Sequence, residues 1–169
     1  MKIDWVSLES IMQKIPMTQR EFHMLEEELQ QLKEIRRPNI LRAITVARAL
    51  GDLSENAEYH SAKEEQGMIE ARIQYIEGRI YNAEVIDITK LHGDTITFGA
   101  TVTVRDEHTS TKHKYQIVGA EEANPNEGRL PVTSPLAKAL IGKKVGATVE
   151  FSSPKGMQEY TVENIEFLG

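Results

Sequence analysis

The chain contains no cysteine and few aromatic residues. Without cysteine, disulfide bonds and thiolate metal sites are excluded, which fits a reducing cytosol. Aromatic residues make up only 6% of the 169 residues, as expected where helical arms replace part of a globular core. No apolar run approaches the ~20 residues of a membrane span, and the first residues lack the pattern of a signal peptide. We therefore expect a cytoplasmic protein that does not enter a membrane.

Basic residues are outnumbered by acidic ones. Lysine and arginine total 20 against 26 aspartates and glutamates, a net charge of −6, whereas a free-standing nucleic-acid binder is usually basic. The bases gather in residues 33–48 and the acids in residues 52–70. Two interpretations stand side by side: ion pairs between neighbouring helices, or contacts with the phosphates of RNA. The bases concerned are Lys33, Arg36, Arg37, Arg42 and Arg48.

Two long stretches, residues 18–50 and 55–86, show apolar residues spaced as on one face of a helix. Gly51 suits the left-handed position that ends the first helix. Neither stretch is apolar enough to be stable alone, so each should bury its apolar stripe against the other. Because the connection is short, the pattern predicts an antiparallel hairpin with arms roughly 45–50 Å long.

The first arm has a clear start and an interruption. Thr18 followed by Glu21 is the spacing of a capping box at a helix N-terminus. Pro38 lies within the arm and is expected to bend the helix, because proline removes a backbone hydrogen bond. The apolar stripe resumes after the proline in a shifted register.

A short segment, residues 1–14, precedes the hairpin. Trp5, Leu8 and Met12 are spaced as on a helix. The segment is either a short amphipathic helix or a frayed extension, and the sequence does not decide between them.

The C-terminal half has a different periodicity. From Ile96 onward apolar and polar residues alternate, as in half-buried strands. Ser134 and Pro135 suit the N-cap and first position of a short helix that ends at Gly142. These features predict a small α+β domain with an antiparallel sheet, after a linker near residues 87–95. The expected strands are 96–104, 112–118, 129–133, 148–152 and 159–167.

Two carboxylates, Asp52 and Glu55, lie in the turn between the two arms. Their spacing resembles a capping box for the second helix, with Ser54 as an alternative N-cap. Capping does not explain why the acids stand at the end of a long hairpin. Two carboxylates also suit Mg²⁺, which often takes one or two carboxylates and completes its shell with waters and phosphates. Both interpretations remain open from spacing alone.

Residues 51–60, with the sequence GDLSENAEYH, resemble the tip motif of the bacterial transcript cleavage factors of the Gre family. The resemblance covers about residues 15–169, and residues 1–14 precede the family's usual start. The modest basic cluster and acidic total favour the GreA branch over the more basic GreB branch. Further matching blocks are Ile15–Thr18, Phe98–Val102, Ile117–Gly119 and Ser134–Gly142.

The resemblance implies a fold and a partner. It implies an antiparallel coiled coil over residues 15–88 with an acidic tip at 51–56, followed by an FKBP-like domain over residues 96–169. In this family the C-terminal domain docks on bacterial RNA polymerase, and the coiled coil enters the secondary channel. The chain is expected to act as a monomer. Ser134 and Pro135 are the docking residues that the resemblance suggests.

The resemblance also implies the chemistry. Asp52 and Glu55 would help to hold a second Mg²⁺ and position the attacking water, while aspartates of the polymerase hold the first ion. The 3′ end of backtracked nascent RNA is then cleaved, and elongation resumes. The chain would therefore be an accessory factor, not an enzyme, and would bind no cofactor when isolated. Supporting roles at the tip fall to Asn56, Glu58 and Tyr59.

Two other classes of function are compatible with a long hairpin followed by a small domain. A non-catalytic binder of the secondary channel would inhibit or modulate polymerase, but the intact acidic pair argues against it. A coiled-coil adaptor or a prolyl isomerase is the third class. The isomerase is disfavoured because the C-terminal half has few of the aromatic residues that such a pocket needs.

Overall fold

The computed structural model describes residues 14–52 and 55–168. Among these residues two compact units are distinguished. The first comprises residues 14–15 and 22–83, and the second comprises residues 16–21 and 84–168. The predicted helix or extension over residues 1–14 lies almost entirely outside the described residues.

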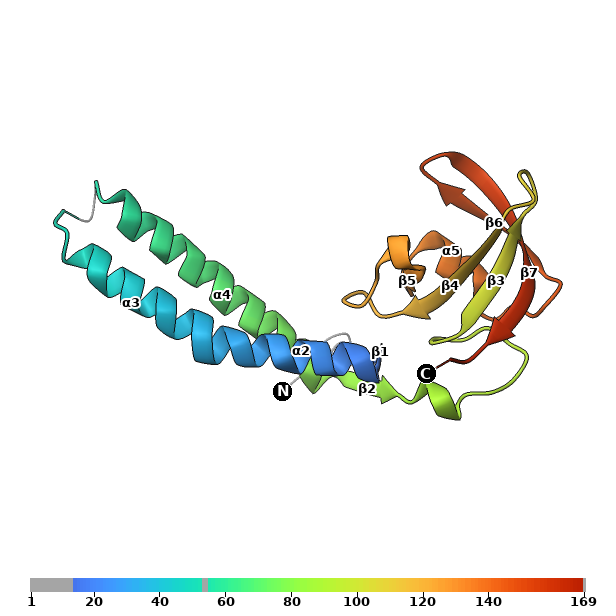
Figure 1. Ribbon diagram of the computed structural model, residues 1–169, viewed down its shortest axis with the longest axis horizontal. Helices are drawn as coiled ribbons and strands as arrows, with labels where there is room; N and C mark the ends of the chain where they lie inside the picture. Colours follow the sequence, from blue (N-terminus) through green and yellow to red (C-terminus); the bar gives the residue numbers. More distant parts are fainter. Residues whose placement is uncertain (1–13, 53–54, 169) are drawn as a thin grey trace, which may run out of the picture. The chain divides into compact units, whose positions relative to one another are not determined.

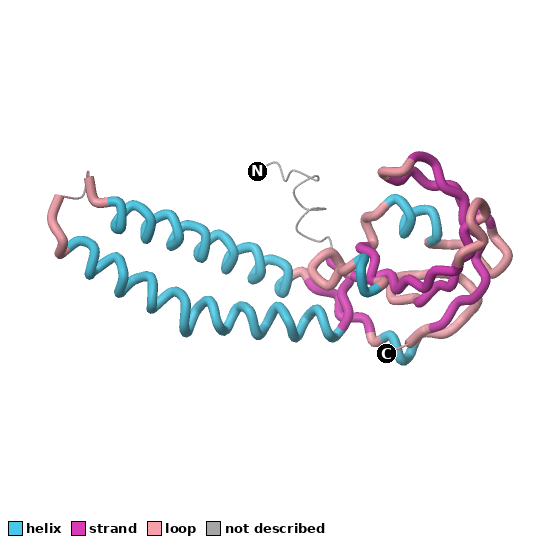
Figure 2. Tube along the Cα trace, turned by 45° about the horizontal axis from the view of Figure 1, so that its top comes forward, coloured by secondary structure: helices cyan, strands magenta, loops and turns pink. Residues whose placement is uncertain are grey.

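The first unit is a hairpin of helices (Figure 1). Its first arm consists of α2 (Gln19–Gln31), a π-helical turn η1 (Leu32–Arg36) and α3 (Arg37–Arg48), and its second arm is α4 (Ala57–Tyr81). The arms lie side by side in both views (Figures 1 and 2). The predicted apolar stripes form the seam, where the buried side chains are Leu25, Leu32, Ile40, Ile44, Ala47, Ala62, Ile69, Ile73 and Ile76.

The chain accommodates Pro38 through η1. Pro38 lies in the first turn of α3, where its missing N–H group costs least, and the π-helical turn directly precedes it. The backbone N–H of Arg37 donates to the carbonyl of Leu32, five residues earlier. The extra residue in this turn accounts for the shifted register, because the next buried seam residue after Leu32 is Ile40.

The second arm is shorter than predicted. α4 ends at Tyr81, and the last predicted helical residues form strand β2 (Ala83–Ile86). Strand β2 pairs with β1 (Ile15–Thr18) in a two-stranded sheet. The prediction of a helix to Ile86 was therefore wrong, since these residues find backbone partners in a neighbouring strand instead.

The second unit is built on a five-stranded sheet in the order β5-β4-β3-β7-β6, and these strands are labelled in Figure 1. Strands β3 and β4, β3 and β7, and β6 and β7 pair antiparallel, whereas β4 and β5 run parallel. The sheet is antiparallel as predicted, except for the parallel pairing of β5 at this edge. The strands are β3 (Thr101–Asp106), β4 (Lys112–Val118), β5 (Arg129–Pro131), β6 (Thr148–Ser153) and β7 (Gly156–Glu166).

One short helix, α5 (Pro135–Leu140), packs beside β6. The core beneath it is aliphatic and includes the fully buried Val102, Ile117 and Leu140. Ile96 is also fully buried, but it precedes the sheet. Gly99 turns the chain at φ +87°, and β3 begins only after this turn, so the strand predicted over residues 96–104 starts later than expected. The predicted linker contains a short 3-10 helix, η2 (Ile88–Lys90). A second 3-10 helix, η3 (Pro125–Glu127), precedes β5.

The start of α2 belongs to the second unit. The Glu21 backbone N–H donates to Thr18 Oγ1 at 3.1 Å, which confirms Thr18 as the cap. The Glu21 side chain contacts a segment that is distant in the sequence. It is fully buried and accepts a hydrogen bond from the backbone N–H of Glu121 at 3.3 Å. The Thr18 hydroxyl donates to the side-chain carboxylate of Glu122, and the Glu21 carboxylate lies against Gly119, so the start of α2 packs against residues 119–122.

Candidate functional site at the hairpin tip

The tip is the segment between α3 and α4, and it is described except for residues 53–54. α3 ends at Arg48, and Gly51 adopts φ +126°, a left-handed value that favours glycine. The chain then resumes at Glu55 and enters α4 at Ala57. Asp52 and Glu55 therefore flank the undescribed pair, and both are exposed.

Asn56 is the N-cap of α4. Its Oδ1 accepts a hydrogen bond from the backbone N–H of Tyr59 at 3.0 Å. The interpretation of Asp52 and Glu55 as a capping box was wrong, because the residue that follows them caps the helix. Ser54, the alternative N-cap, lies outside the described residues, and Asn56 occupies that position. The two acids are thus not explained by helix capping.

The tip acids line one open hollow of about 430 Å³. Its lining residues are Leu50, Asp52, Glu55, Asn56, Ala57 and Glu58. Across residues 14–52 and 55–168, no group of three histidine or carboxylate side chains is placed to hold a metal ion. The tip can offer carboxylate oxygens to a cation, but other ligands must complete the coordination shell.

A second interaction crosses the tip beside Asn56. The guanidinium of Arg48, at the end of α3, lies 5.7 Å from the centroid of the Tyr59 ring on α4. This distance is within the range of a cation–π interaction. The ring of Tyr59 also meets that of His60 edge to face at 5.5 Å. Asn56 and Tyr59, predicted as supporting residues, are therefore placed at the junction of the two arms.

Three of the five predicted RNA-contacting bases form ion pairs across the hairpin. Lys33 Nζ lies 2.6 Å from Glu77 Oε1, and Arg36 Nη2 lies 3.2 Å from Glu65 Oε1. Arg37 binds both carboxylate oxygens of Glu70 at 2.7 and 2.8 Å. The ion-pair interpretation is confirmed for these three bases.

The Arg37–Glu70 pair also perturbs both ionisation equilibria. The hydrogen bond from Arg37 lowers the pKa of Glu70, and the same bond raises the pKa of Arg37. Both side chains are partly exposed, so solvent screens the interaction.

The remaining two bases lie nearer the tip. Arg42 is exposed and donates to the side chain of Asn39, within its own helix. Arg48 is exposed and stacks on Tyr59. Neither of these interactions is with an acid, so within the described residues no paired carboxylate offsets the positive charge of these two guanidinium groups near the acidic tip.

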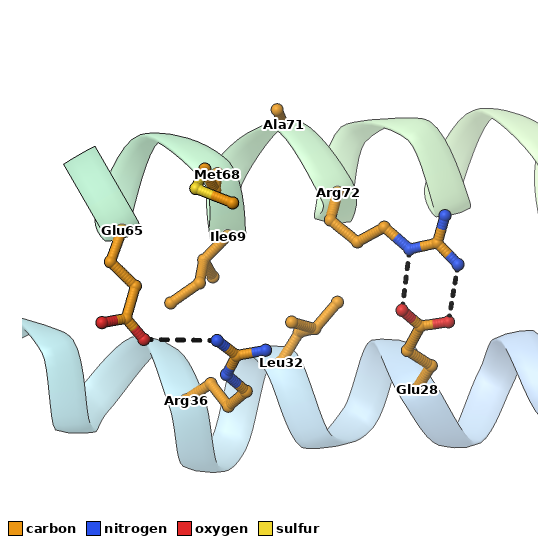
Figure 3. Close-up of a pocket in the computed structure, with 8 residues that line it drawn as sticks. All are labelled: Glu28, Leu32, Arg36, Glu65, Met68, Ile69, Ala71 and Arg72. Atoms are coloured by element: carbon orange, nitrogen blue, oxygen red, sulfur yellow. Dashed lines mark hydrogen bonds and ion pairs between the residues drawn. The ribbon is translucent and has the colours of Figure 1, made fainter.

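Sequence reasoning missed one cross-arm pair. Arg72 on α4 binds both carboxylate oxygens of Glu28 at 2.7 and 2.8 Å. With the Arg36–Glu65 pair it brackets an apolar groove of about 560 Å³, where Leu32 and Ile69 lie between the two ion pairs (Figure 3). The register of the two seams could have revealed this pair, because Glu28 and Arg72 lie close to the facing seam residues.

The predicted docking residues lie in the second unit. Ser134 is the N-cap of α5, and its Oγ accepts from the Ala137 backbone N–H at 3.2 Å. Pro135 occupies the first turn and is exposed. The local prediction of a capped short helix is confirmed, while the docking role stays a prediction.

Two family models together match most of the chain. The N-terminal model of a transcription elongation factor matches residues 15–85, and the C-terminal model of GreA/GreB elongation factors matches residues 91–167. The chain belongs to the GreA/GreB family of transcription elongation factors. Membership in the GreA/GreB family confirms the resemblance that residues 51–60 suggested.

Curated GreA proteins are similar over almost the whole chain. Transcription elongation factor GreA of Caulobacter sp. (strain K31) is 52% identical over 157 residues, which are 93% of this chain and 100% of that protein. GreA of Methylobacterium nodulans is 52% identical over 158 residues, 94% of this chain and 100% of that protein. The crystal structure of GreA factor homolog 1 of Thermus thermophilus is 26% identical, with a TM-score of 0.43, and covers 91% of this chain and 99% of that one.

No helix within residues 14–52 and 55–168 is long and apolar enough to cross a membrane.

Proposed function

We propose that this chain stimulates the cleavage of backtracked RNA by bacterial RNA polymerase, with its hairpin tip inserted in the secondary channel. The observation that carries the proposal is the pair of exposed acids, Asp52 and Glu55, at the tip. Because Asn56 caps α4, the helix does not need these acids. Their presence at the far end of a long hairpin is accounted for if they act inside a partner.

The tip fits a shared Mg²⁺ ion better than a resident one. Asp52 and Glu55 supply anionic oxygens around an open hollow that Glu58 also lines, but no closed ligand set exists among the described residues. Asp52 and Glu55 would help to hold a second Mg²⁺, and in two-metal phosphodiester cleavage one ion would supply activation of the water and the other would stabilise the leaving oxygen. The remaining ligands would come from the polymerase and from the RNA.

The chain's own residues have three tasks in this proposal. Asp52 and Glu55 accept hydrogen bonds from the attacking water and orient it toward the scissile phosphate. Arg42 and Arg48 carry positive charge near the tip and can attract the phosphates of the extruded RNA. Lys33, Arg36 and Arg37 are engaged in cross-arm pairs, so we assign them first to holding the hairpin together.

The C-terminal unit provides docking in this proposal. Exposed Pro135 and the adjacent Ser134 form a rigid, capped helix start that a rim of the polymerase could contact. The chain would act as a monomer in the bacterial cytoplasm and would be an accessory factor rather than an enzyme.

A non-catalytic channel binder is the alternative. It would use the same hairpin and the same docking unit, but it would not need carboxylates at the tip. The exposed pair, which is not the N-cap of α4, favours cleavage over simple occupation of the channel.

The experiment compares conservative variants in a backtracked elongation complex. Asp52→Asn and Glu55→Gln remove one charge each, and Glu64→Gln, on α4 outside the tip, is the matched control. We expect both tip variants to compete with the wild type for polymerase but to lose at least about tenfold in maximal cleavage rate, with partial recovery at raised Mg²⁺. The control should behave as the wild type. Full stimulation by both tip variants would refute the cleavage role and favour the non-catalytic binder.

A further inference from the structure

The side chain of Asn56 contacts both arms of the hairpin at once. Its Oδ1 accepts from the backbone N–H of Tyr59 in the first turn of α4. Its Nδ2 donates to the backbone carbonyl of Ala47 in the last turn of α3, at 2.6 Å. Ala47 is 3% exposed, so this carbonyl belongs to a residue buried at the end of the seam.

The contact with Ala47 is not required for capping. An N-cap needs an acceptor for the orphan backbone N–H groups of the helix, and aspartate or serine provides one as well as asparagine. The donor side of the amide serves a second purpose, because it reaches across to a backbone carbonyl in the last turn of α3. The Ala47 carbonyl accepts a further hydrogen bond from the backbone N–H of Leu50 at 3.1 Å. Asn56 therefore joins the start of α4 to the turn that leaves α3.

We propose that Asn56 is a positioning residue, which fixes where Asp52 and Glu55 stand by joining the ends of α3 and α4. Both acids lie within the segment that this side chain closes, and Asn56 lines the same hollow as they do. The contact between the Arg48 guanidinium and the Tyr59 ring also joins the end of α3 to the start of α4. The inference rests on the proposed function of the acids, and it assigns Asn56 a role in geometry, with no contact to the metal or the RNA.

Small displacements matter because the acids must meet ligands supplied by another molecule. A misplacement of about 1 Å at a catalytic site can cost about 100-fold in rate. Because one amide joins the ends of α3 and α4 before the hairpin meets the polymerase, less ordering is needed when the site assembles.

The test uses the full chain with Asn56→Asp and Asn56→Ser. Both replacements keep an N-cap acceptor and remove the amide N–H that reaches the Ala47 carbonyl: aspartate has no donor, and the serine hydroxyl is one bond shorter than the asparagine amide. The serine variant adds no charge, so it separates the lost donor from an extra carboxylate at the tip. Asn82→Asp is the matched control, because Asn82 Nδ2 donates to the Gly78 carbonyl at 2.8 Å at the other end of α4.

Three readouts are compared: hydrogen exchange of the Leu50 amide, the half-saturating factor concentration, and the maximal cleavage rate with its Mg²⁺ dependence. We expect faster Leu50 exchange in both Asn56 variants, an unchanged half-saturating concentration, a maximal rate lowered about 10- to 100-fold, and a higher Mg²⁺ requirement. The Asn82→Asp control should leave all of these at wild-type values.

Each contrary result has a distinct meaning. Unchanged Leu50 exchange in both Asn56 variants overturns the inference, whatever the cleavage rate. Faster exchange with a normal maximal rate also overturns it, provided that Asp52→Asn is inactive in the same assay. Equal losses in the Asn56 variants and in Asn82→Asp would show a general effect on the helix and overturn positioning. If Asp52→Asn keeps full stimulation, the proposed function fails, and the positioning role fails with it.

Discussion

Replacing Gly119 by alanine should destabilise the second unit through a single steric conflict. A Cβ atom at position 119 would lie 2.0 Å from Oε2 of Glu21 and 2.8 Å from its carboxylate carbon. The φ angle of Gly119 is not in the left-handed region, so alanine brings no backbone strain there. The whole effect therefore comes from the contact with Glu21.

The magnitude follows from what the buried carboxylate must give up. Glu21 is fully buried and accepts from the backbone N–H of Glu121, so it can move only by disturbing the turn around residues 119–122. Overpacking of this kind costs about 1–3 kcal/mol, and loss of one hydrogen bond to a charged group costs about 1.5–3 kcal/mol. We expect a decrease of about 2–4 kcal/mol in the free energy of unfolding of this unit.

Thermal unfolding followed by circular dichroism measures the effect. For a unit of roughly 90 residues, 2 kcal/mol corresponds to a lower midpoint by at least about 8 °C. Gly67→Ala is the matched control: it lies inside α4 with nothing within 4 Å of its Cβ position, and it should stabilise the hairpin by up to about 1 kcal/mol. Combining Gly119→Ala with Glu21→Ala should remove most of the steric cost. A midpoint within about 1 °C of the wild type for Gly119→Ala alone would refute this reasoning.

The other predictions concern function and the hairpin. The purified chain without polymerase should not cleave RNA or bind Mg²⁺ tightly, which RNA incubation and calorimetry can check, and robust nuclease activity would contradict the proposal. Arg42→Ala should raise the half-saturating factor concentration more at low salt than at high salt, whereas Arg36→Ala with Arg37→Ala should mainly lower hairpin stability; equal dose responses for Arg42→Ala and the wild type would reduce Arg42 to a surface charge. The hydrogen bond from Arg37 lowers the pKa of Glu70 in the folded hairpin, so the ion pair should stabilise the hairpin above the ordinary pKa of 4.5 and lose this effect as the pH falls through the folded pKa. The melting temperatures of Glu70→Gln and the wild type should therefore converge in acid. Pro135→Ala should raise the half-saturating concentration without changing the maximal rate, and an unchanged concentration would place docking elsewhere.

The sequence was sufficient for the parts of the fold that periodicity and caps determine. The apolar stripes predicted the hairpin seam, and Thr18 and Ser134 cap their helices as predicted. The family assignment came from residues 51–60 and is confirmed by the family models.

The sequence was insufficient where one pattern suits two structures or where the partner is distant. Residues 83–86 continue a helical spacing, but pairing with β1 makes them a strand. The edge strand β5 pairs parallel to β4, a choice that alternation of apolar residues does not specify. Glu21 has the spacing of a capping box, but its side chain lies against Gly119, about 100 residues away in the chain. Each of these outcomes depends on contacts that local periodicity does not encode.

The tip shows the same limit in a form that matters for function. Asp, Ser, Glu and Asn occur within five consecutive residues there, and three of these four types are good N-caps, so spacing alone left the cap open. Among these four types only Asn carries an acceptor and a donor on two separate atoms, and only the approach of α3 to α4 gives that donor a carbonyl to bind. Once Asn56 is assigned to the backbone, Asp52 and Glu55 no longer have a structural task in capping. The case for a shared metal site thus depends on a contact between two helices, which the sequence of the tip by itself does not reveal.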